Sequence, residues 1–552
     1  MGKIYKKNIS NKEYYVYQYR EGDKQYSKSV SEAEAYEISF KNGFLKENDD
    51  YDEFINHQFH SIVIVGKRLF ESIVSTRKYN KRYIYKNLKD YLDNDYSGKV
   101  FILYGLRRTG KTTLIFQSIL DLPMDEFHKV AFIKIQEGES FYDLQKDLDY
   151  LYKHGIRYFY IDEVTLLEQF IDMASDLSDY YALNCKIVLS GTDSLSFLFA
   201  KEDELYNRAI IVHSTYISYK EFSEVLDIDS IDQYIEYGGT MVKEGIYYNS
   251  VNSRGNNEYV DTAIAHNIVH SLKYYNDGDH FSSMYPLYEK GELVNVINRI
   301  IEDRNHQFAV ETINRTFKSH DYGSLKNLVN KKGQPLKGAL EEVDEKQLIE
   351  DLKALLDIID ADKRKEAVNQ SVILEVEAYL DLLDLCKEVD EVNASSFEVT
   401  KRKVFIQPGL RYAQAKALVE VLFKQPSINK HPKIIRDALK EKILSDVKGR
   451  MLEEIVLYQT SLSKETFKLL FPIGEYDMVT INEEDKSTDI YEIKYSLVEA
   501  HEQRKYLLAN EYQSIVNNAY YPIKNKYVLY RGNSGEIDGI KYINVGEYLK
   551  SL

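Results

Sequence analysis

The chain has 552 residues, of which 72 are Lys or Arg and 88 are Asp or Glu, so its net charge is −16. Hydrophobic residues at 44% and charged residues at 29% are ordinary for globular proteins and exclude a largely disordered chain. At about 150 residues per domain, the length predicts about three or four domains. The sequence has neither an apolar stretch near the ~20 residues that span a bilayer nor an apolar signal core, so we expect a cytoplasmic protein without a membrane partner.

The acidity is concentrated in one segment. Residues 341–391 carry 17 acidic and 6 basic side chains, a net charge of −11. Residues 401–450 carry 13 basic and 4 acidic side chains, and residues 65–90 carry 8 and 2, which gives net charges of +9 and +6. Such runs form either solvated helix faces or surfaces for a nucleic acid. A further hypothesis is that the acidic segment mimics a nucleic acid and covers residues 401–450.

The first thirty residues alternate polar residues with aromatic or aliphatic ones, and Arg20–Asp23 interrupts the alternation. This pattern predicts a β-hairpin. Two glutamates shortly after Ser31 predict that a helix begins there. The tyrosines of residues 14–19 either pack against that helix or stack on nucleic-acid bases.

From residue 99, short apolar runs alternate with helical stretches. Continuous apolar runs at this spacing are typical of a buried parallel sheet with helices on both faces. The predicted strands are Val100–Tyr104, Val130–Ile135, Tyr158–Ile161, Ile187–Leu189 and Ile210–Ile217. Residues 220–400 show a mainly helical pattern, and later strands are predicted at 475–481, 489–495 and 526–530.

A phosphate-loop motif follows the first of these strands. Residues 105–112 read Gly-Leu-Arg-Arg-Thr-Gly-Lys-Thr, which matches G-x-x-x-x-G-K-[ST] between a strand and a helix. Backbone N–H groups of such a loop surround phosphate oxygens beside a helix N-terminus. We expect ATP and Mg²⁺ as cofactors, with Lys111 on the β- and γ-phosphates and Thr112 on Mg²⁺. The expected nucleotide-binding residues are Gly105, Arg108, Thr109, Gly110, Lys111, Thr112, Thr113 and Thr192.

Polar residues end the neighbouring strands. Asp162 is predicted to bind Mg²⁺, and Glu163 is predicted to polarise the attacking water. Thr192 either senses the γ-phosphate or belongs to a helix N-terminus. Arg208 is either an arginine finger or a solvated side chain, and a finger acts in trans or in cis. Because a finger in trans acts on a neighbouring subunit, the sequence leaves open whether the protein forms a homo-oligomer.

The C-terminal region contains Asp477 and, 15 residues later, Glu492-Ile493-Lys494, which fits a D…(D/E)-x-K pattern. Because side chains alternate along a strand, Glu492 and Lys494 share one face. Asp477 and Glu492 would bind Mg²⁺, which activates water and polarises a phosphodiester, while Lys494 stabilises charge. Glu453 or Glu454 on an upstream helix would add a carboxylate. Ordinary exposed strands also show this short pattern.

Taken in order, these segments resemble the prokaryotic AAA-type ATPases that couple an N-terminal P-loop domain to a C-terminal restriction-endonuclease-like domain. The resemblance covers residues 60–225 and 405–552 and aligns Glu453 with the family's helix glutamate. Asn207 replaces the family's glycine before the arginine, so the placement of Arg208 stays open. The matching segments are Gly105–Thr113, Ile161–Glu163, Ser190–Thr192, Asn207-Arg208, Ile217–Phe222 and Tyr237–Gly239.

The expected fold class is multidomain α/β, and we divide it into four parts. Residues 1–45 form a β-hairpin plus a helix, and residues 46–225 form a P-loop ATPase domain with an AAA/ASCE-type parallel sheet. The resemblance implies a helical, winged-helix-like module at 226–405 and a PD-(D/E)XK nuclease-like domain at 406–552.

The expected function is that of an AAA-type ATPase that hydrolyses ATP and controls a Mg²⁺-dependent nuclease, with DNA rather than RNA as the partner. The expected catalytic residues are Lys111, Glu163, Arg208, Glu453, Asp477, Glu492 and Lys494, and the expected metal ligands are Thr112, Asp162, Asp477 and Glu492. One alternative is a nucleotide-dependent switch whose C-terminal domain binds a nucleic acid or a protein without cleaving it. Another is a motor that remodels proteins.

Overall fold

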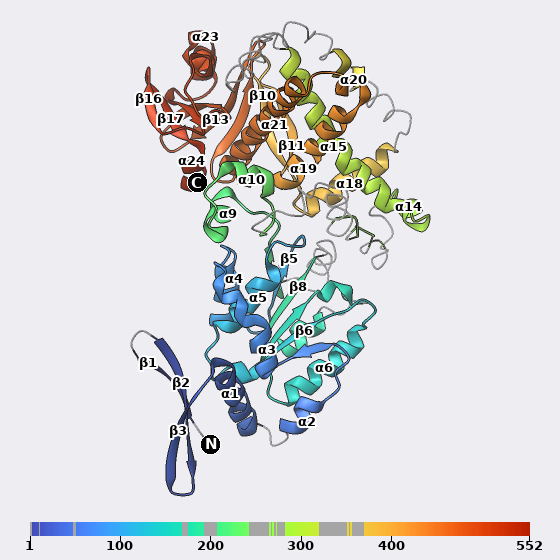
Figure 1. Cartoon of the computed structure of the whole chain (residues 1–552), viewed down its shortest axis with the longest axis vertical. Coiled ribbons are helices and arrows are strands. Elements are labelled where there is room, and N and C mark those ends of the chain that lie inside the picture. The colour runs from blue at the N-terminus through green and yellow to red at the C-terminus, as the bar shows by residue number, and fades with distance from the viewer. Residues whose placement is uncertain are drawn as a thin grey trace. The chain divides into compact units, whose positions relative to one another are not determined.

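The chain divides into two units, Met1–Thr215 with His266–Gly278 and Tyr216–Ala265 with Asp279–Leu552. Figure 1 shows the computed structural model from which both are described. The described residues are 3–9, 12–47, 51–167, 170, 175–192, 207–241, 264–266, 268–269, 272, 282–318, 350–352, 354–355 and 369–552.

The first unit begins with a three-stranded antiparallel sheet. Its strands β1 (Lys3–Ile9), β2 (Lys12–Glu21) and β3 (Lys24–Val30) lie side by side in chain order. The predicted turn near Gly22 is confirmed, but the hairpin prediction was incomplete because a further break separates β1 from β2. Residues 6–13 are polar except for Ile9, so the alternation that predicts strands is weak on both sides of this break.

Helix α1 (Glu32–Glu47) begins where the sequence predicted. The Glu34 backbone N–H donates to Ser31 Oγ at 3.2 Å, and the Ser31 N–H donates to the Glu34 carboxylate at 2.7 Å. This reciprocal pair satisfies two of the donors that a helix start leaves open. Tyr15 is buried between the sheet and α1, and its hydroxyl donates to Glu32 at 2.7 Å. For Tyr15, packing against the helix is the observed arrangement.

The region expected to be an ATPase domain contains a six-stranded sheet in the order β4-β6-β7-β8-β5-β9. Its strands are β4 (Ile62–Ile64), β5 (Val100–Tyr104), β6 (Val130–Lys134), β7 (Tyr158–Asp162), β8 (Lys186–Gly191) and β9 (Ala209–His213). Five strands are parallel and β4 pairs antiparallel with β6. The five strands predicted here are present, but β9 ends at His213 and not at Ile217. Strand β8 separates the phosphate-loop strand from the strand that ends in Asp162, which is compatible with the expected ASCE-type sheet.

Both faces of this sheet are covered. Ile102 and Ile133 lie in one apolar cluster with α6 (Phe141–Lys153), whereas Phe101 and Phe132 lie in a second cluster. That second cluster includes α3 (Gly66–Ile73), α4 (Tyr85–Asp93) and α5 (Lys111–Leu120). Full burial of each such side chain contributes about 1.5–3 kcal/mol, which explains why the strands are continuous apolar runs. The short helix α2 (Tyr51–Asn56) contributes Phe54 to the first cluster.

The second unit contains an eight-stranded mixed sheet in the order β11-β10-β12-β13-β14-β15-β17-β16. Its strands are β10 (Cys386–Asn393), β11 (Val399–Phe405), β12 (Glu465–Leu470), β13 (Glu475–Asn482), β14 (Ser487–Ile493), β15 (Ile523–Tyr530), β16 (Gly535–Ile537) and β17 (Ile540–Asn544). The three strands predicted here correspond to β13, β14 and β15. Strands β10 and β11 belong to this sheet, so the predicted boundary at 405/406 divides it, and residues 386–405 are not part of a helical module.

Helices pack around this second sheet. They are α9 (Tyr219–Leu226), α10 (Ile231–Tyr237), α14 (Tyr285–Glu289), α15 (Leu293–Lys318), α18 (Gln370–Leu382), α19 (Pro408–Lys424), α20 (Pro426–Asn429), α21 (Lys433–Ser461), α22 (Lys505–Leu508), α23 (Asn510–Ala519) and α24 (Val545–Ser551). Much of the predicted winged-helix-like module lies outside the described residues. Within the described ranges, every helix is too short or too polar to cross a bilayer.

Candidate functional site

The phosphate loop joins β5 to α5 through backbone conformations that side chains rarely adopt. Gly105 has φ +138°, Arg108 +67° and Gly110 +89°. A Cβ atom at Gly105 would lie 2.7 Å from Ser214 Oγ and 2.8 Å from Thr215 Oγ1. Gly105 is therefore required both by its backbone angle and by the lack of space.

Three residues that the sequence did not single out hold this loop. The guanidinium of buried Arg82 donates to the carbonyl oxygens of Thr109 and Ser214, both at 2.7 Å. The Leu106 N–H donates to Thr215 Oγ1 at 3.0 Å, and the hydroxyls of Thr109 and Ser214 lie 2.8 Å apart. Arg82 belongs to the basic run 65–90, but only the folded structure shows which of its eight cations supports the loop.

Lys111 lies at the start of α5 and is buried. Its ammonium donates to the carbonyl oxygens of Gly105 at 2.8 Å and Leu106 at 2.9 Å. Burial lowers the pKa of Lys111 to about 8, although the carboxylates of Glu163 and Asp162 act in the opposite direction. The ammonium is thus held inside the loop, where it can attract a phosphate.

The carboxylates at the end of β7 meet hydroxyl groups from α5 and β8. Thr112 Oγ1 donates to Asp162 Oδ2 at 2.9 Å, and Ser190 donates to the other Asp162 oxygen. Thr192 Oγ1 donates to Glu163 Oε2 at 3.4 Å. Burial raises the pKa of Glu163, against the lowering effect of Lys111. The structure brings these predicted residues together at the carboxyl edge of the sheet, where Thr112 and Asp162 are positioned to share a divalent cation.

The remaining predicted residues of this site lie in two places. Arg108 is exposed on the phosphate loop, and Thr113 is half-buried in the first turn of α5. Arg208 lies at the end of the strands that is opposite the phosphate loop, because its carbonyl oxygen accepts a hydrogen bond from the Val100 N–H at the start of β5. Five strand residues, about 16 Å, separate this end from the loop. An extended arginine side chain is shorter than this separation, which favours a finger in trans or a solvated side chain, and Arg208 Nε lies 3.4 Å from Asp179. The role of Arg208 stays a prediction.

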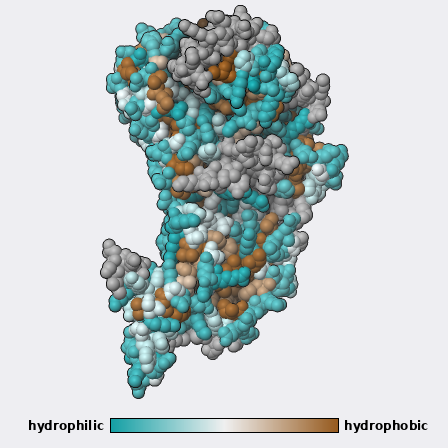
Figure 2. All heavy atoms as spheres, in the orientation of Figure 1, coloured by the Kyte–Doolittle hydropathy of each residue, from teal (hydrophilic) through white to brown (hydrophobic). Residues whose placement is uncertain are grey.

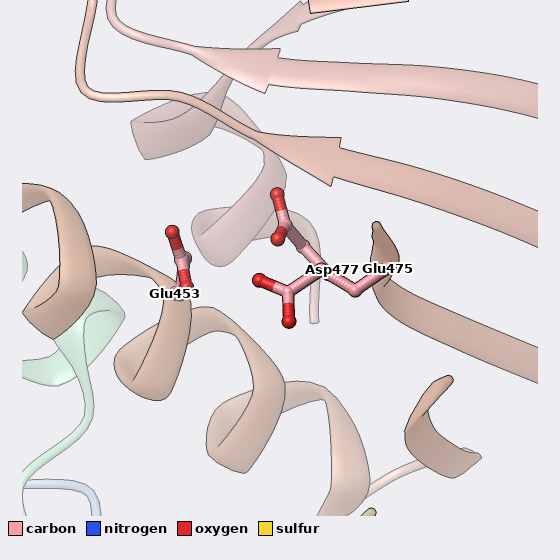
Figure 3. A group of neighbouring side chains, drawn as sticks. All are labelled: Glu453, Glu475 and Asp477. Atoms are coloured by element: carbon pink, nitrogen blue, oxygen red, sulfur yellow. The ribbon is translucent and has the colours of Figure 1, made fainter. Parts of the chain in front are cut away.

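A second cluster of carboxylates lies in the second unit. Figure 3 shows Glu453 on α21 pointing toward Glu475 and Asp477 on β13. One carboxylate oxygen of each lies within 4.8 Å of one oxygen of each of the other two. The sequence named Glu453 and Asp477 but gave Glu475 no role. Its place two residues before Asp477 on a strand was the available signal, because it puts both side chains on one face.

Glu492 and Lys494 from β14 complete this cluster. The Lys494 ammonium lies 2.6 Å from a Glu492 oxygen and 2.9 Å from an Asp477 oxygen. The Ile493 N–H donates to Asp477 at 2.7 Å. Glu492 is buried, and its Oε1 has no hydrogen-bond partner among the described residues. The predicted quartet of Glu453, Asp477, Glu492 and Lys494 is thus assembled.

Burial and mutual repulsion shift the acidities in this cluster. Burial, with the Asp477 charge second, raises the pKa of Glu453 to about 7 and that of Glu492 to about 8. Burial also acts to raise the pKa of Asp477, but the ammonium groups of Lys494 and Lys468 hold it below its ordinary value. Asp477 is therefore the most readily ionised of these three carboxyl groups, and a bound cation would favour ionisation of the others.

The choice between Glu453 and Glu454 is decided by the rotation of α21. Glu454 is buried between Arg402, whose Nη2 lies 2.7 Å from it, and Arg411. Glu453 points to the cluster instead, 3.6 Å from the Lys468 ammonium. Glu454 is thus an ion-pair residue, and Glu453 is the helix carboxylate of the cluster. A cavity of about 420 Å³ borders the cluster at Lys468 and Glu475.

The basic runs are largely used in internal ion pairs. In the run 401–450, residues of β11 pair with the acidic run. Lys401 pairs with Asp390 at 2.5 Å and Arg402 with Glu391 at 3.2 Å, both on the neighbouring strand β10, and Lys403 pairs with Asp381 of helix α18 at 2.9 Å. In the run 65–90, Arg77 pairs with Glu32 and Lys81 with Asp121. Described members of the acidic run therefore pair with part of the basic run within one fold. That the acidic run mimics a nucleic acid stays a hypothesis.

The strand order of the six-stranded sheet and the loop between β5 and α5 are compatible with a P-loop AAA fold. Residues 97–223 match the model of an AAA domain family, so the chain contains an AAA domain. No curated protein matches the sequence.

Two solved structures show only weak likeness to the chain. One is the Aeropyrum pernix ORC1 protein in complex with DNA, with 11% identity, a TM-score of 0.22 and coverage of 65% of this chain and 93% of that one. The other is the S. cerevisiae Hsp104–ADP complex, with 10% identity, a TM-score of 0.26 and coverage of 73% and 61%. Scores this low carry no argument about fold or function.

Proposed function

We propose that the protein hydrolyses ATP at its AAA domain and carries a Mg²⁺-dependent nuclease site for DNA in its second unit. The AAA match and the closed phosphate loop support the first half. The observation that carries the second half is the cluster of Glu453, Glu475 and Asp477. Lys494 joins Glu492 to this cluster, because it pairs with both Asp477 and Glu492.

At the ATPase site, each residue has a chemical task that fits its surroundings. Lys111 binds the β- and γ-phosphates, and the loop N–H groups surround them. Thr112 and Asp162 fit Mg²⁺ because both offer hard oxygen atoms at one point. Bound Mg²⁺ would neutralise phosphate charge. Glu163, with its raised pKa, can accept a proton from the attacking water.

At the nuclease-like site, the donor set also fits Mg²⁺. Carboxylate oxygens of three residues lie within 4.8 Å of one another, and the unpartnered Oε1 of buried Glu492 is a further hard ligand beside them. The bound ion would supply an activated water and polarise a phosphodiester. Lys494 contacts both Asp477 and Glu492, so its ammonium can stabilise charge that develops on the phosphate.

The test compares cleavage and ATP hydrolysis in the same variants. With plasmid DNA, ATP and Mg²⁺, Lys494→Ala should abolish cleavage and leave ATP hydrolysis intact, because Lys494 belongs to the nuclease-like cluster alone. Exposed Lys505, on α22 outside the cluster, provides the control Lys505→Ala, which should retain both activities.

If the wild type hydrolyses ATP and binds DNA but leaves DNA and RNA intact, the protein is a nucleotide-dependent switch instead. Stimulation of ATP hydrolysis by polypeptide but not DNA would favour the protein-remodelling motor.

A further inference from the structure

The N-terminal sheet has two faces with different roles. Because side chains alternate along a strand, the pairings Ile4 with Tyr17 and Tyr15 with Val30 define the face that packs on α1. The pairings Lys7 with Tyr14 and Arg20 with Gln25 belong to the opposite face, which we call the outer face. Its described side chains are Lys3, Tyr5, Lys7, Tyr14, Val16, Gln18, Arg20, Gln25, Ser27 and Ser29.

The outer face is uncovered and basic. Its described side chains are all exposed or half-buried, and none of them is acidic. Three cations lie among amides and hydroxyls that can both donate and accept hydrogen bonds. Residues 3–30 carry seven Lys or Arg and three Asp or Glu, in a chain whose net charge is −16. In Figure 2 the tip of this sheet, at lower left, is coloured mainly hydrophilic.

The aromatic side chains of the helix-facing side are already engaged with one another. Tyr17 stacks on Tyr19 with ring centroids 5.2 Å apart, and Tyr19 stacks on Tyr26 at 5.7 Å. Of these rings, Tyr17 packs beside Tyr15 in the contact with α1, whereas Tyr26 is exposed. Proteins that bind single strands without sequence preference present aromatic platforms for bases. In this sheet the longest row of rings lies on the helix-facing side and not on the outer face, which favours duplex DNA over a single strand as the partner.

The dimensions of the outer face match a DNA groove. Neighbouring strands lie about 4.8 Å apart, so the three strands span about 10 Å between the axes of β1 and β3. The major groove of B-DNA is about 12 Å wide and presents donors and acceptors on base edges. Phosphates on either side of the groove attract Lys and Arg side chains.

We propose that the outer face of β1–β3 docks in the major groove of duplex DNA, with Lys3 and Lys7 on phosphates and Arg20, Gln18 and Gln25 toward base edges. The proposal goes beyond the proposed nuclease and does not depend on it, because this sheet would bind DNA whether or not the second unit cleaves it. It also supplies cations outside the basic runs 65–90 and 401–450, several of whose cations are engaged in internal ion pairs.

The test measures binding of the full chain to a fluorescent duplex oligonucleotide in EDTA, where metal-dependent cleavage cannot occur. The variant Lys7→Ala/Arg20→Ala removes two outer-face cations. Its matched control, Lys24→Ala/Lys28→Ala, removes two exposed cations of β3 whose side chains lie on the opposite face. The outer-face variant should weaken binding by about tenfold or more and lower the slope of log K against log salt by about 1.8. The control should bind nearly as the wild type does.

Equal losses in the two variants, or no loss in the outer-face variant, would overturn the proposal. A preference for a single-stranded oligonucleotide that the outer-face variant abolishes would also overturn it, since the partner would then not be a duplex. ATP hydrolysis and the melting temperature should be unchanged in both variants, which shows that they fold. Because the binding assay contains no divalent cation, its result is separate from that of the Lys494→Ala cleavage assay.

Discussion

Lys111 carries its charge in a buried loop, and this gives ATP binding a dependence on pH. Its pKa is lowered to about 8, so the side chain is protonated below that pH and neutral above it. Only the ammonium form attracts phosphates. We therefore expect ATP affinity to be nearly constant below about pH 7 and to fall through pH 8, by about tenfold at about pH 9. Titration with ATP across this range measures the effect.

The control for this dependence is Lys111→Arg. A guanidinium remains protonated across the whole range, so this variant should bind ATP with the same affinity at every pH, even if that affinity is low. A flat profile in the wild type would show that the Lys111 charge is not what titrates.

Helix α21 places two adjacent glutamates in opposite roles. Glu454→Gln should lower the free energy of unfolding by about 3 kcal/mol, because it removes the charge that pairs buried Arg411 and half-buried Arg402. Glu453→Gln should abolish Mg²⁺ binding at the cluster and leave stability equal or higher, because it relieves repulsion with Asp477. Urea denaturation and calorimetric titration with Mg²⁺ give the two values. The reverse pattern would place Glu454 in the cluster.

At the scale of elements, the sequence predicted the strands whose apolar runs are continuous and clearly bounded. The strands of the ATPase sheet are buried on both faces and therefore continuous apolar runs, so they were found. Strand β4 has three residues and was missed. Strands β10 and β11 were taken for part of a helical module, because their charged side chains are typical of solvated surfaces. Their ion pairs form across neighbouring strands, which the sequence cannot show.

The residues of the candidate sites were predictable only where local spacing along the chain determines their positions. Motif residues such as Lys111 and Asp162 follow from local spacing, because a strand, a loop and a helix start fix their positions. The choice between Glu453 and Glu454 depends on how far α21 is rotated against the sheet. The support of Arg82 for Thr109 depends on a contact between segments 27 residues apart. Neither can be obtained from local patterns.

At the scale of the whole chain, two units with separate cores should respond to separate ligands. A ligand that binds only the folded state stabilises it by about 2.7 kcal/mol at 100 times its dissociation constant. Scanning calorimetry should therefore show two transitions. ATP in EDTA should raise the melting temperature of one transition only, and the variant Lys111→Ala should abolish this increase. Mg²⁺ alone should raise chiefly the melting temperature of the other transition, and the variant Asp477→Asn should abolish that increase. A single transition raised by both ligands would show that the units unfold together.

The contacts of Arg82 set the extent of the smallest piece of this ATPase that can fold by itself. The segment that matches the AAA family begins at residue 97, but the donor for the carbonyls of Thr109 and Ser214 comes from residue 82. Tyr36 of α1 stacks on Phe70 at 4.2 Å, which links the same core to the start of the chain. A fragment cut at the limit of similarity would leave two buried carbonyls without their donor. The boundary of sequence similarity, at residue 97, therefore differs from the boundary of the folded domain, which includes Arg82.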